Sequence, residues 1–509
     1  MGSQQNGNLF EVFCSRFPTD LRTTLLLTGE GEGYTYADLL CESARLANYL
    51  ITLGAKPGDR VTVQLEKSPQ ILFLYLACLR AGLVYHPLNT AYQASELTYF
   101  LGDAQPHIVV CSAGSYELFS SLAKQSEVAH VLTMEANNSG TLCSGARGCS
   151  DTFETAMCKP DDMAALLYSS GTTGRPKGIM LSHENLASNG KTLVEQWGFS
   201  SADHLLHVLP VFHVHGLFVA IHCVLLSGAS MRWLDKFDIS TALTYLPECT
   251  VMMGVPTYYT RLLSEPTFGE DSCVNMRLFI SGSAPLLAET FEQFHTRTGY
   301  TIIERYGMTE TNMNTSNPLA GERRAGTVGT ALPGVDVRVI DSEGRSLDAG
   351  NTGDLQVRGE NVFQGYWRMP EKTREDFTAD GFFNTGDKAS MSSDGYVTIV
   401  GRSKDMVICG GLNVYPKEVE QLLDTIPGVV ESAVIGVPHA DFGEAVVAVV
   451  VPVIGQSLSD VDVIAFCKEN IANFKVPKRV MIVDELPRNT MGKVQKNVLR
   501  ERFNDCCKS

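Results

Sequence analysis

The chain has 509 residues, of which 44% are hydrophobic and 19% charged, and its formal net charge is −16. This length exceeds what one hydrophobic core supports, so we expect at least two domains, and the composition is that of a globular rather than a disordered protein. The acidic balance argues against nucleic-acid binding, which needs a basic face, although a local cluster of Arg and Lys can still hold an anionic substrate.

The cysteines and the apolar segments of the sequence indicate in which cellular compartment the protein is expected. The 14 cysteines form no C-x-x-C pair and no zinc-ligand spacing, which favours reduced thiols in a reducing compartment. The longest apolar run, residues 71–79, ends at Arg80 and is too short to span a membrane. The first residues show neither a signal peptide nor an Arg-rich transit pattern. We therefore expect a cytoplasmic protein and leave a mitochondrial location open.

Helix and strand patterns alternate through the first part of the chain. Thr35 is placed to cap a helix whose apolar residues recur at helical spacing. Residues 60–65 alternate like a strand, residues 69–81 form an apolar helical pattern, and residues 107–111 are typical of a buried strand. This order predicts a parallel sheet. The Gly-, Ser- and Cys-rich segment 137–150 is predicted to be a surface loop.

A glycine-rich stretch follows at residues 168–183, YSSGTTGRPKGIMLSH, directly after an apolar run predicted to be a buried strand. Its backbone N–H groups and hydroxyls can surround a phosphate, and Lys177 supplies charge. Pro176 before this lysine and the glycine after it exclude the usual mononucleotide pattern G-x-x-x-x-G-K-[ST]. We predict a long, mobile phosphate-binding loop rather than a polar surface turn, with Ser182 as the N-cap of the next helix.

The strand–helix alternation resumes after this stretch and then changes character. Short β-rich runs punctuated by glycine occupy residues 326–400 and predict a small distorted barrel or sandwich attached to the α/β core. The charged segment 401–405 is predicted to be a linker, and the residues after it a small α+β domain. We therefore predict an α/β protein with a large N-terminal domain of parallel sheets and helices, residues 1–402, and a mobile C-terminal domain, residues 403–509.

Several polar clusters can carry chemistry, and each has a structural alternative. Residues 304–310, ERYGMTE, offer a ring for stacking a base and a carboxylate for Mg²⁺, or form a loop with a core tyrosine. Residues 382–387, FFNTGD, place a carboxylate suited to a ribose, or an ordinary turn aspartate. His213 and His215 have no third ligand nearby, which disfavours a metal site. Lys493 in a late loop is, by itself, a solvated surface residue.

Taken together in this order, these segments resemble the adenylate-forming superfamily of acyl-CoA synthetases, peptide-synthetase adenylation domains and beetle luciferases. The resemblance covers essentially the whole chain. It rests on residues 169–178, 306–310, 385–387 and 401–405 and on Lys493, in this order and with these separations. It implies a two-domain acid–thiol ligase that uses ATP, Mg²⁺ and CoA.

The resemblance also implies roles for residues at the nucleotide. The glycine-rich loop would close over the β- and γ-phosphates, and Tyr306 would stack on adenine. Thr309 would bind the α-phosphate and Glu310 would hold Mg²⁺, which makes both catalytic, while Asp387 and Arg402 would bind ribose. The full set implied for ATP and AMP is Ser169, Ser170, Gly171, Thr172, Thr173, Gly174, Lys177, Glu304, Arg305, Tyr306, Gly307, Thr309, Asp387 and Arg402.

The C-terminal domain would supply the catalytic lysine and the path for CoA. Lys493 would bridge the carboxylate and the α-phosphate during adenylation, where an ammonium offsets the growing negative charge. Asp405 would be the hinge about which this domain rotates between adenylation and thioester formation. Gly410 and Gly411 would line the pantetheine channel, because residues without side chains leave room for a thin ligand.

Within the superfamily the chain resembles malonyl-CoA synthetases, on the stretches 209–218, 253–261, 281–285 and 306–316. A dicarboxylate needs a fixed cation for the carboxylate that does not react, and arginine suits this planar partner. Arg261 resembles the arginine that serves this purpose in the family, although a snorkelling surface arginine is the alternative. Ser283 would assist it, and His213 would border the acyl pocket.

The reaction implied starts from malonate and ATP and yields malonyl-adenylate and pyrophosphate, after which CoA yields malonyl-CoA and AMP. A related short-chain or aryl carboxylate–CoA ligase is one alternative, against which Arg261 argues. A non-catalytic nucleotide-binding relative is another, against which Lys493, Glu310 and Asp387 argue. No nucleic-acid or membrane partner is implied, and monomer and homodimer both stay open.

Overall fold

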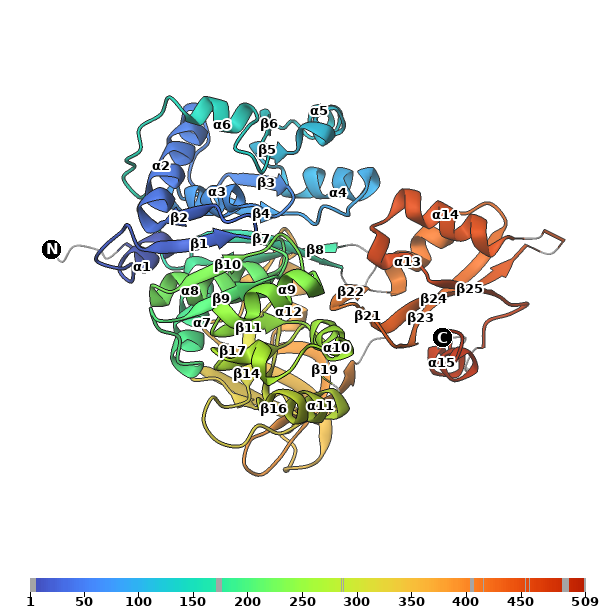
Figure 1. The fold of residues 1–509 in the computed structure, drawn as a ribbon. Coiled ribbons are helices and arrows are strands. Elements are labelled where there is room, and N and C mark those ends of the chain that lie inside the picture. Colours follow the sequence, from blue (N-terminus) through green and yellow to red (C-terminus); the bar gives the residue numbers. More distant parts are fainter. Residues whose placement is uncertain are drawn as a thin grey trace.

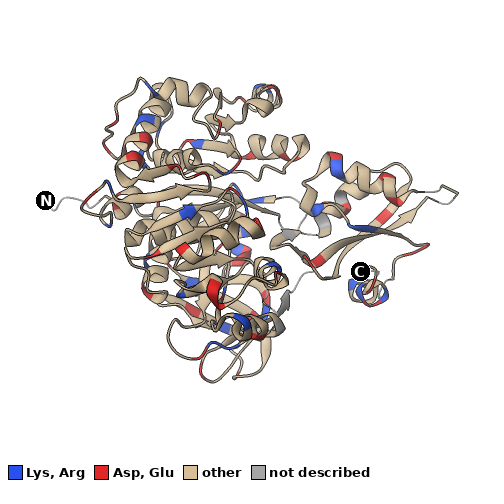
Figure 2. Cartoon of the chain, viewed as in Figure 1, with Lys and Arg blue, Asp and Glu red and all other residues tan. Residues whose placement is uncertain are grey.

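The computed structural model describes residues 6–170, 176–284, 286, 288–402, 407–414, 416–453, 455–456, 458–487 and 494–507. Figure 1 shows a large N-terminal part, built from described residues up to 402, and a smaller C-terminal part, built from residue 407 onward, lying at one side of it. In these residues we find no helix with the length and apolar character of a membrane span. Figure 2 shows Lys and Arg interspersed with Asp and Glu over both parts.

The first sheet of the N-terminal part is built on the predicted strand–helix alternation. Thr35 caps the first long helix with a capping box, as predicted, and its apolar face is buried. The segment predicted to be a surface loop, 137–150, instead contains a short helix, because Leu142, Cys143 and Ala146 bury one face.

The strand order of this first sheet is β18 (Gly365–Tyr366), β8 (Pro176–Ser182), β7 (Met163–Ser170), β4 (Val84–Pro87), β3 (Arg60–Gln64), β5 (Ile108–Cys111) and β6 (His130–Thr133). The helices are α2 (Tyr36–Thr52), α3 (Pro69–Arg80), α4 (Ala94–Ala104), α5 (Tyr116–Gln125) and α6 (Thr141–Ala146).

The second sheet lies against the first, and one large hydrophobic cluster joins them. Leu72 of α3 and Leu205 of the second sheet belong to this same core. The strand order is β15 (Thr330–Ala331), β14 (Asn312–Ser316), β13 (Ile302–Met308), β12 (Leu278–Ser281), β11 (Val251–Gly254), β9 (His204–His207), β10 (Ser230–Trp233), β1 (Thr24–Thr28) and β2 (Gly33–Thr35). The helices are α1 (Leu9–Cys14), α7 (His183–Gln196), α8 (Ile221–Ser227), α9 (Ile239–Tyr245), α10 (Pro256–Ser264) and α11 (Ala288–Thr298).

The β-rich segment 326–400 forms an antiparallel sheet at one end of the N-terminal part (Figure 1). Its strands are β16 (Val335–Ile340), β17 (Thr352–Gly359), β19 (Phe383–Met391) and β20 (Val397–Arg402), and α12 (Pro370–Asp376) precedes β19. The predicted linker 401–405 is therefore wrong at its start: Gly401 and Arg402 extend β20 and pair with Lys388 and Asp387. Residues 403–406 lie outside the described residues.

The C-terminal part forms one mixed sheet with a hydrophobic cluster on each face. Its strands are β22 (Leu412–Val414), β21 (Val407–Cys409), β24 (Gly443–Pro452), β23 (Val429–His439) and β25 (Arg479–Ile482), the last of which pairs with β24 in parallel. Its helices are α13 (Pro416–Leu423), α14 (Asp460–Asn470) and α15 (Lys496–Phe503). The predicted fold class, a large α/β part and a small α+β part, is confirmed.

Candidate active site

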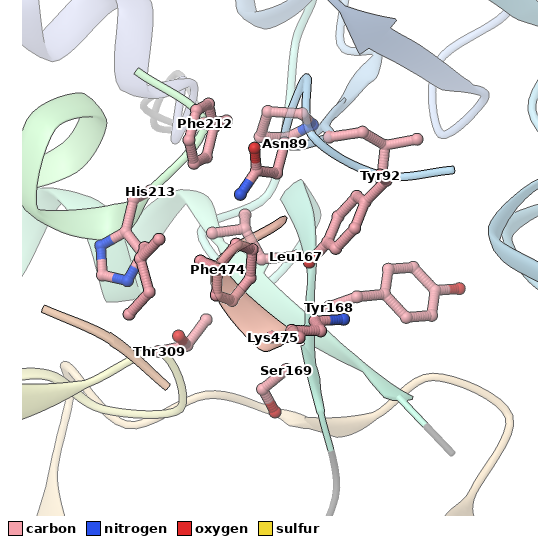
Figure 3. A pocket seen from close by; sticks show the side chains of 13 residues that line it. Asn89, Tyr92, Leu167, Tyr168, Ser169, Phe212, His213, Thr309, Phe474 and Lys475 are labelled. Atoms are coloured by element: carbon pink, nitrogen blue, oxygen red, sulfur yellow. The ribbon is translucent and has the colours of Figure 1, made fainter. Parts of the chain in front are cut away.

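A cavity lies where the two parts of the chain meet, at the carboxyl ends of β4 and β7 in the first sheet and of β9 in the second. Segments that follow such strands converge at one edge of a sheet, where α/β proteins bind ligands. Its volume is about 80 Å³, small beside the roughly 300–1,000 Å³ of most ligand pockets, and side chains of both parts form its wall. Figure 3 draws the side chains that line it, which are Pro87, Leu88, Asn89, Tyr92, Leu167, Tyr168, Ser169, Phe212, His213, Thr309, Leu412, Phe474 and Lys475.

The predicted phosphate loop lies between two antiparallel strands, β7 and β8. Strand β7 continues to Ser170 and β8 begins at Pro176, so the structure shortens the predicted loop at both ends. Its central residues, including Gly171, Thr172, Thr173 and Gly174, lie outside the described residues. The helix after β8 begins with a capping box on Ser182, as predicted.

The strand ends on either side of this loop face different neighbours. Ser169 Oγ lies 3.3 Å from Glu310 Oε1, so the strand end sits beside the predicted Mg²⁺ ligand. Lys177 is buried instead: its ammonium lies 4.4 Å from the centroid of the Tyr366 ring and 3.8 Å from Asp376 Oδ2. Ser169, which is predicted to bind the nucleotide, therefore lies beside Glu310, the predicted Mg²⁺ ligand. Lys177 lies against β18 and α12 instead.

The predicted adenosine residues come together from two sheets. Tyr306 of β13 donates a hydrogen bond of 2.5 Å to Asp387 Oδ2 of β19. Asp387 in turn lies opposite Arg402 in the pairing of β19 with β20. Residues more than eighty positions apart in the chain thus form one cluster, as a site for a base and a ribose requires, and their roles stay predictions.

Two neighbouring charged residues of β13 are buried. The Glu304 carboxylate accepts a hydrogen bond of 2.9 Å from the Leu286 N–H, and burial raises its pKa to about 7. Arg305 is only 3% exposed, and burial lowers the pKa of its guanidinium to about 9. Among the described residues, none accepts a hydrogen bond from its Nε or Nη2. Buried guanidinium N–H groups without an acceptor are costly, which makes this position a candidate site for an anion.

Gly282 leaves the space that the Arg305 guanidinium occupies. The Arg305 guanidinium lies so close above Gly282, just after β12, that a Cβ atom at residue 282 would collide with it. A side chain at residue 282 would therefore push the guanidinium away. The motif resemblance placed Arg305 with the nucleotide, whereas this geometry places its charge beside the predicted acyl residues.

Two histidines and a serine surround that charge. Ser283 Oγ lies 3.3 Å from His215 Nδ1, and the His215 backbone N–H donates to His213 Nδ1 at 3.4 Å. Burial first, and then the Arg305 charge, lowers the pKa of both imidazoles, that of His213 to about 4. Both rings are therefore neutral near pH 7, and Arg305 is left as the cation of this cluster.

Arg261 lies elsewhere, on α10 at the boundary between the two parts. It forms a bidentate ion pair with Asp441, with Nε–Oδ1 and Nη2–Oδ2 distances of 3.1 and 3.0 Å. The two side chains are 37% and 46% exposed, so this pair is only half-buried. The structure therefore ties Arg261 to the C-terminal part, and its predicted contact with a substrate carboxylate stays a prediction.

The predicted CoA path is represented by the turn between β21 and β22. Gly410 and Gly411 both adopt left-handed backbone conformations, with φ of +58° and +79°, which tighten this turn. A Cβ at residue 411 would lie 3.0 Å from Val255 Cγ1, so the turn presses on the N-terminal part. Leu412 next to it lines the cavity. The hinge residue Asp405 and the catalytic Lys493 lie outside the described residues.

Among the lining residues, sequence reasoning assigned only Ser169, His213 and Thr309 to the site, and those it missed include Tyr92, Phe474 and Lys475. Lys475 is 2% exposed and forms ion pairs with residues 379 and 57 positions away. Its sequence neighbourhood, NFKVPK, does not distinguish it from the neighbouring Lys478, and a lysine is by itself typical of an exposed surface. The partners that keep it buried are known only from the fold.

Comparisons with known proteins agree with this geometry. Two family models match, AMP-binding enzyme over residues 10–367 and AMP-binding enzyme C-terminal domain over residues 418–493. A malonate–CoA ligase of Arabidopsis thaliana is 32% identical, over 98% of this chain and 90% of that protein. The crystal structure of ATP-bound MatB from Rhodopseudomonas palustris is 52% identical, with a TM-score of 0.79 over 99% of this chain and 100% of that one.

A third relative is a solved malonyl-CoA ligase, in a ternary product complex with methylmalonyl-CoA and AMP bound. It is 34% identical, with a TM-score of 0.80 over 94% of this chain and 100% of that one. The two family matches cover the two-sheet core and most of the C-terminal part, and they leave residues 368–417 between them. The chain belongs to the family of AMP-binding enzymes.

Proposed function

We propose that this enzyme is an ATP-dependent malonate–CoA ligase that forms malonyl-CoA, AMP and pyrophosphate through a malonyl-adenylate. The observation that carries the choice of acid is the buried Arg305 guanidinium, whose Nε and Nη2 have no acceptor among the described residues. It lies with Ser283, His213 and His215 near the wall of the cavity. The three relatives described above support the same reaction.

The chemistry needs two displacements at one place. A carboxylate oxygen of malonate attacks the α-phosphorus of ATP and pyrophosphate leaves; the CoA sulfur then attacks the acyl carbon and AMP leaves. Thr309 and Lys493 are proposed to hold the α-phosphate oxygens, and Lys493 to offset the charge that grows on them. Tyr306, Asp387 and Arg402 are proposed to fix the adenosine, which keeps the α-phosphorus in line with the attacking oxygen.

Magnesium fits the donor set at the end of β7. The Glu310 carboxylate and the Ser169 hydroxyl are neighbouring oxygen donors, the kind of ligand that Mg²⁺ prefers. The bound ion would neutralise phosphate charge on ATP, which favours both triphosphate binding and pyrophosphate departure. Glu310 is the residue we assign to the ion.

The acid pocket decides between malonate and a simple monocarboxylate. Malonate keeps one carboxylate for adenylation and presents the second to Arg305, which supplies a planar, bidentate partner. A short monocarboxylate or an aryl acid would leave the guanidinium buried and unpaired, at a cost of several kcal/mol in the bound state. This difference favours a dicarboxylate over the alternative acids of the same family.

Domain movement is part of the proposal. We assign residues 1–402 to the nucleotide-binding domain and 403–509 to a mobile domain with its hinge near Asp405, supported by the separate hydrophobic clusters of the C-terminal sheet. The Gly410–Gly411 turn beside Val255 fits the arrangement in which CoA enters. We also propose a cytoplasmic location, because the 14 cysteines show no C-x-x-C pair and no disulfide framework.

One substrate panel tests the function. AMP formation with ATP, Mg²⁺ and CoA would be measured for acetate, malonate, methylmalonate, succinate and oxalate. Malonate is expected to exceed acetate by about 10²–10³-fold in kcat/KM, because acetate leaves Arg305 unpaired. Preference for a monocarboxylate would support the alternative ligase. Absence of AMP formation with every acid would support a nucleotide-binding relative without catalysis.

Comparing Arg261→Ala with Asp441→Ala distinguishes two roles for Arg261, namely binding the distal carboxylate of malonate and linking the two parts of the chain. With Arg305 as the proposed partner of the distal carboxylate, Arg261→Ala is expected to change kcat/KM for malonate and for butyrate alike, whereas a loss of about 10²-fold for malonate alone would return that role to Arg261. Asp441→Ala, which removes only the partner in the C-terminal part, is expected to leave malonate selectivity unchanged. Equal effects of the two variants would show that Arg261 acts solely as a link between the two parts.

A further inference from the structure

Lys475 is a buried lysine that joins the two parts of the chain. It ends a short 3₁₀ turn between α14 and β25, and it is 2% exposed. Its Nζ donates to Glu96 Oε1 of α4 at 2.7 Å and to Glu418 Oε1 of α13 at 2.6 Å. The ammonium also lies 4.8 Å from the centroid of the Tyr92 ring. One carboxylate therefore comes from each part of the chain, and Figure 3 shows Lys475 among the cavity side chains.

The partner on the N-terminal side is held rigidly. Glu96 lies in the first turn of α4, where its second carboxylate oxygen accepts the Gln93 backbone N–H at 3.0 Å. One residue earlier, Ser95 Oγ donates to the Asn470 carbonyl of α14 at 2.8 Å. The N-terminus of α4 thus makes two polar contacts with the C-terminal part, directly beside the cavity.

These contacts depend on how the two parts are arranged. If the C-terminal part moves away from α4, Lys475 keeps Glu418, which belongs to the same part, and loses Glu96 and Tyr92. A buried ion pair is strongly destabilised when one partner is withdrawn, so this bridge stabilises one arrangement over others. In that arrangement the Gly410–Gly411 turn also presses on Val255.

We propose that Lys475 is a positioning residue for the second step of the reaction, and that Glu96 is its partner on the other domain. The bridge holds the C-terminal domain with the Gly410–Gly411 turn at the cavity while the CoA sulfur attacks the acyl-adenylate. It has no part in the attack of the carboxylate on ATP, which needs the domain turned so that Lys493 reaches the α-phosphate. This inference rests on the proposed function.

The test measures the two half-reactions separately in the full-length enzyme. Acid-dependent ATP–pyrophosphate exchange without CoA reports adenylation, and single-turnover transfer from preformed acyl-adenylate to CoA reports the second step. Lys475→Met is expected to slow transfer by about 10²-fold, because misplacing a reacting group by about 1 Å has an effect of this size. Exchange is expected to stay within about twofold. Lys468→Met, an exposed lysine of the same part, is the matched control and should change neither rate.

A second variant guards against simple misfolding. Lys475→Met leaves Glu418 buried without its lysine, whereas Glu96→Gln keeps the Lys475–Glu418 pair and the contact with Gln93. Glu96→Gln is expected to slow transfer by about tenfold, since the amide has one acceptor oxygen, and when that oxygen accepts the Gln93 N–H its NH2 group faces the Lys475 ammonium. In the double variant the loss should not exceed that of Lys475→Met alone, as two changes to one contact are not additive.

These assays use whichever acid the wild-type enzyme adenylates. If the wild-type enzyme does not adenylate malonate but does adenylate another acid, the result counts against the proposed substrate and not against the Lys475–Glu96 contact. Small-angle X-ray scattering gives a readout that needs no substrate: both variants are expected to have a larger radius of gyration than wild type and Lys468→Met. Equal losses in both half-reactions would overturn the positioning role. So would unchanged scattering together with an unchanged transfer rate.

Discussion

Replacing Arg305 with leucine is expected to lower kcat/KM for malonate by about 10²–10³-fold, while activity toward butyrate is retained or increased. The reason is that the distal carboxylate of malonate loses a buried, bidentate cation, a loss of about 3–4 kcal/mol. Butyrate gains an apolar wall in place of an unpaired charge. The measurement is AMP formation with each acid under otherwise equal conditions.

Stability provides the control for this change. Because burial already disfavours the charged guanidinium, Arg305→Leu is expected to raise the Tm of the free enzyme. Arg305→Lys keeps the charge but removes the planar fork, so it should recover only part of the malonate activity. An equal loss toward malonate and butyrate, or a lower Tm with loss of both activities, would contradict an anion-binding role and indicate that Arg305 is structural.

Replacing Lys493 with alanine is expected to lower the rate of adenylation by about 10³-fold and to leave transfer from preformed malonyl-adenylate to CoA within about twofold. An ammonium placed at the α-phosphate stabilises the charge that develops in the first step, and removing one such group typically costs about 10²–10³-fold or more. In the second step AMP is the leaving group, and in the proposed mechanism the C-terminal domain has turned away from the arrangement that brings Lys493 to the α-phosphate. Pyrophosphate exchange and single-turnover transfer measure the two rates.

Lys177→Ala is the comparison for that experiment. Lys177 follows the predicted phosphate loop and is held against Tyr366 and Asp376, so we expect its replacement to disturb that loop and change KM for ATP more than the rate of adenylation. If Lys493→Ala reduced both half-reactions equally, the division of labour between the two lysines would be wrong. Lys493→Ala is expected to slow adenylation alone, and Lys475→Met is expected to slow transfer alone. Measured together, the two variants therefore test whether the domain alternates between two arrangements.

The two-domain mechanism gives the contacts between the parts a functional meaning. The Arg261–Asp441 pair is half-exposed, so it contributes at most about 1 kcal/mol and can exchange partners readily. The Lys475–Glu96 contact is buried and cannot be replaced by water without loss. We therefore expect the buried contact to determine which arrangement is populated and the exposed pair to adjust it.

Local patterns in the sequence predicted much of the fold correctly. Thr35 and Ser182 cap their helices as predicted, because a hydroxyl followed three residues later by an amide or carboxylate side chain is a local signal. The strand before the glycine-rich stretch is also where the apolar run predicts it. The short helix within segment 137–150 was not predicted, because it is stabilised by packing against α2 and not by its own composition.

The sequence by itself determined the order of strands, helices and nucleotide-binding motifs in this protein, since each of these depends on residues that are close together in the chain. Only the tertiary structure decided which charges are buried and what they face. Arg305 has no acceptor for its Nε and Nη2 among the described residues, Arg261 pairs with Asp441, and Lys475 lies between two carboxylates. The free energy of a charge depends on neighbours hundreds of residues away, and these are known only once the chain has folded.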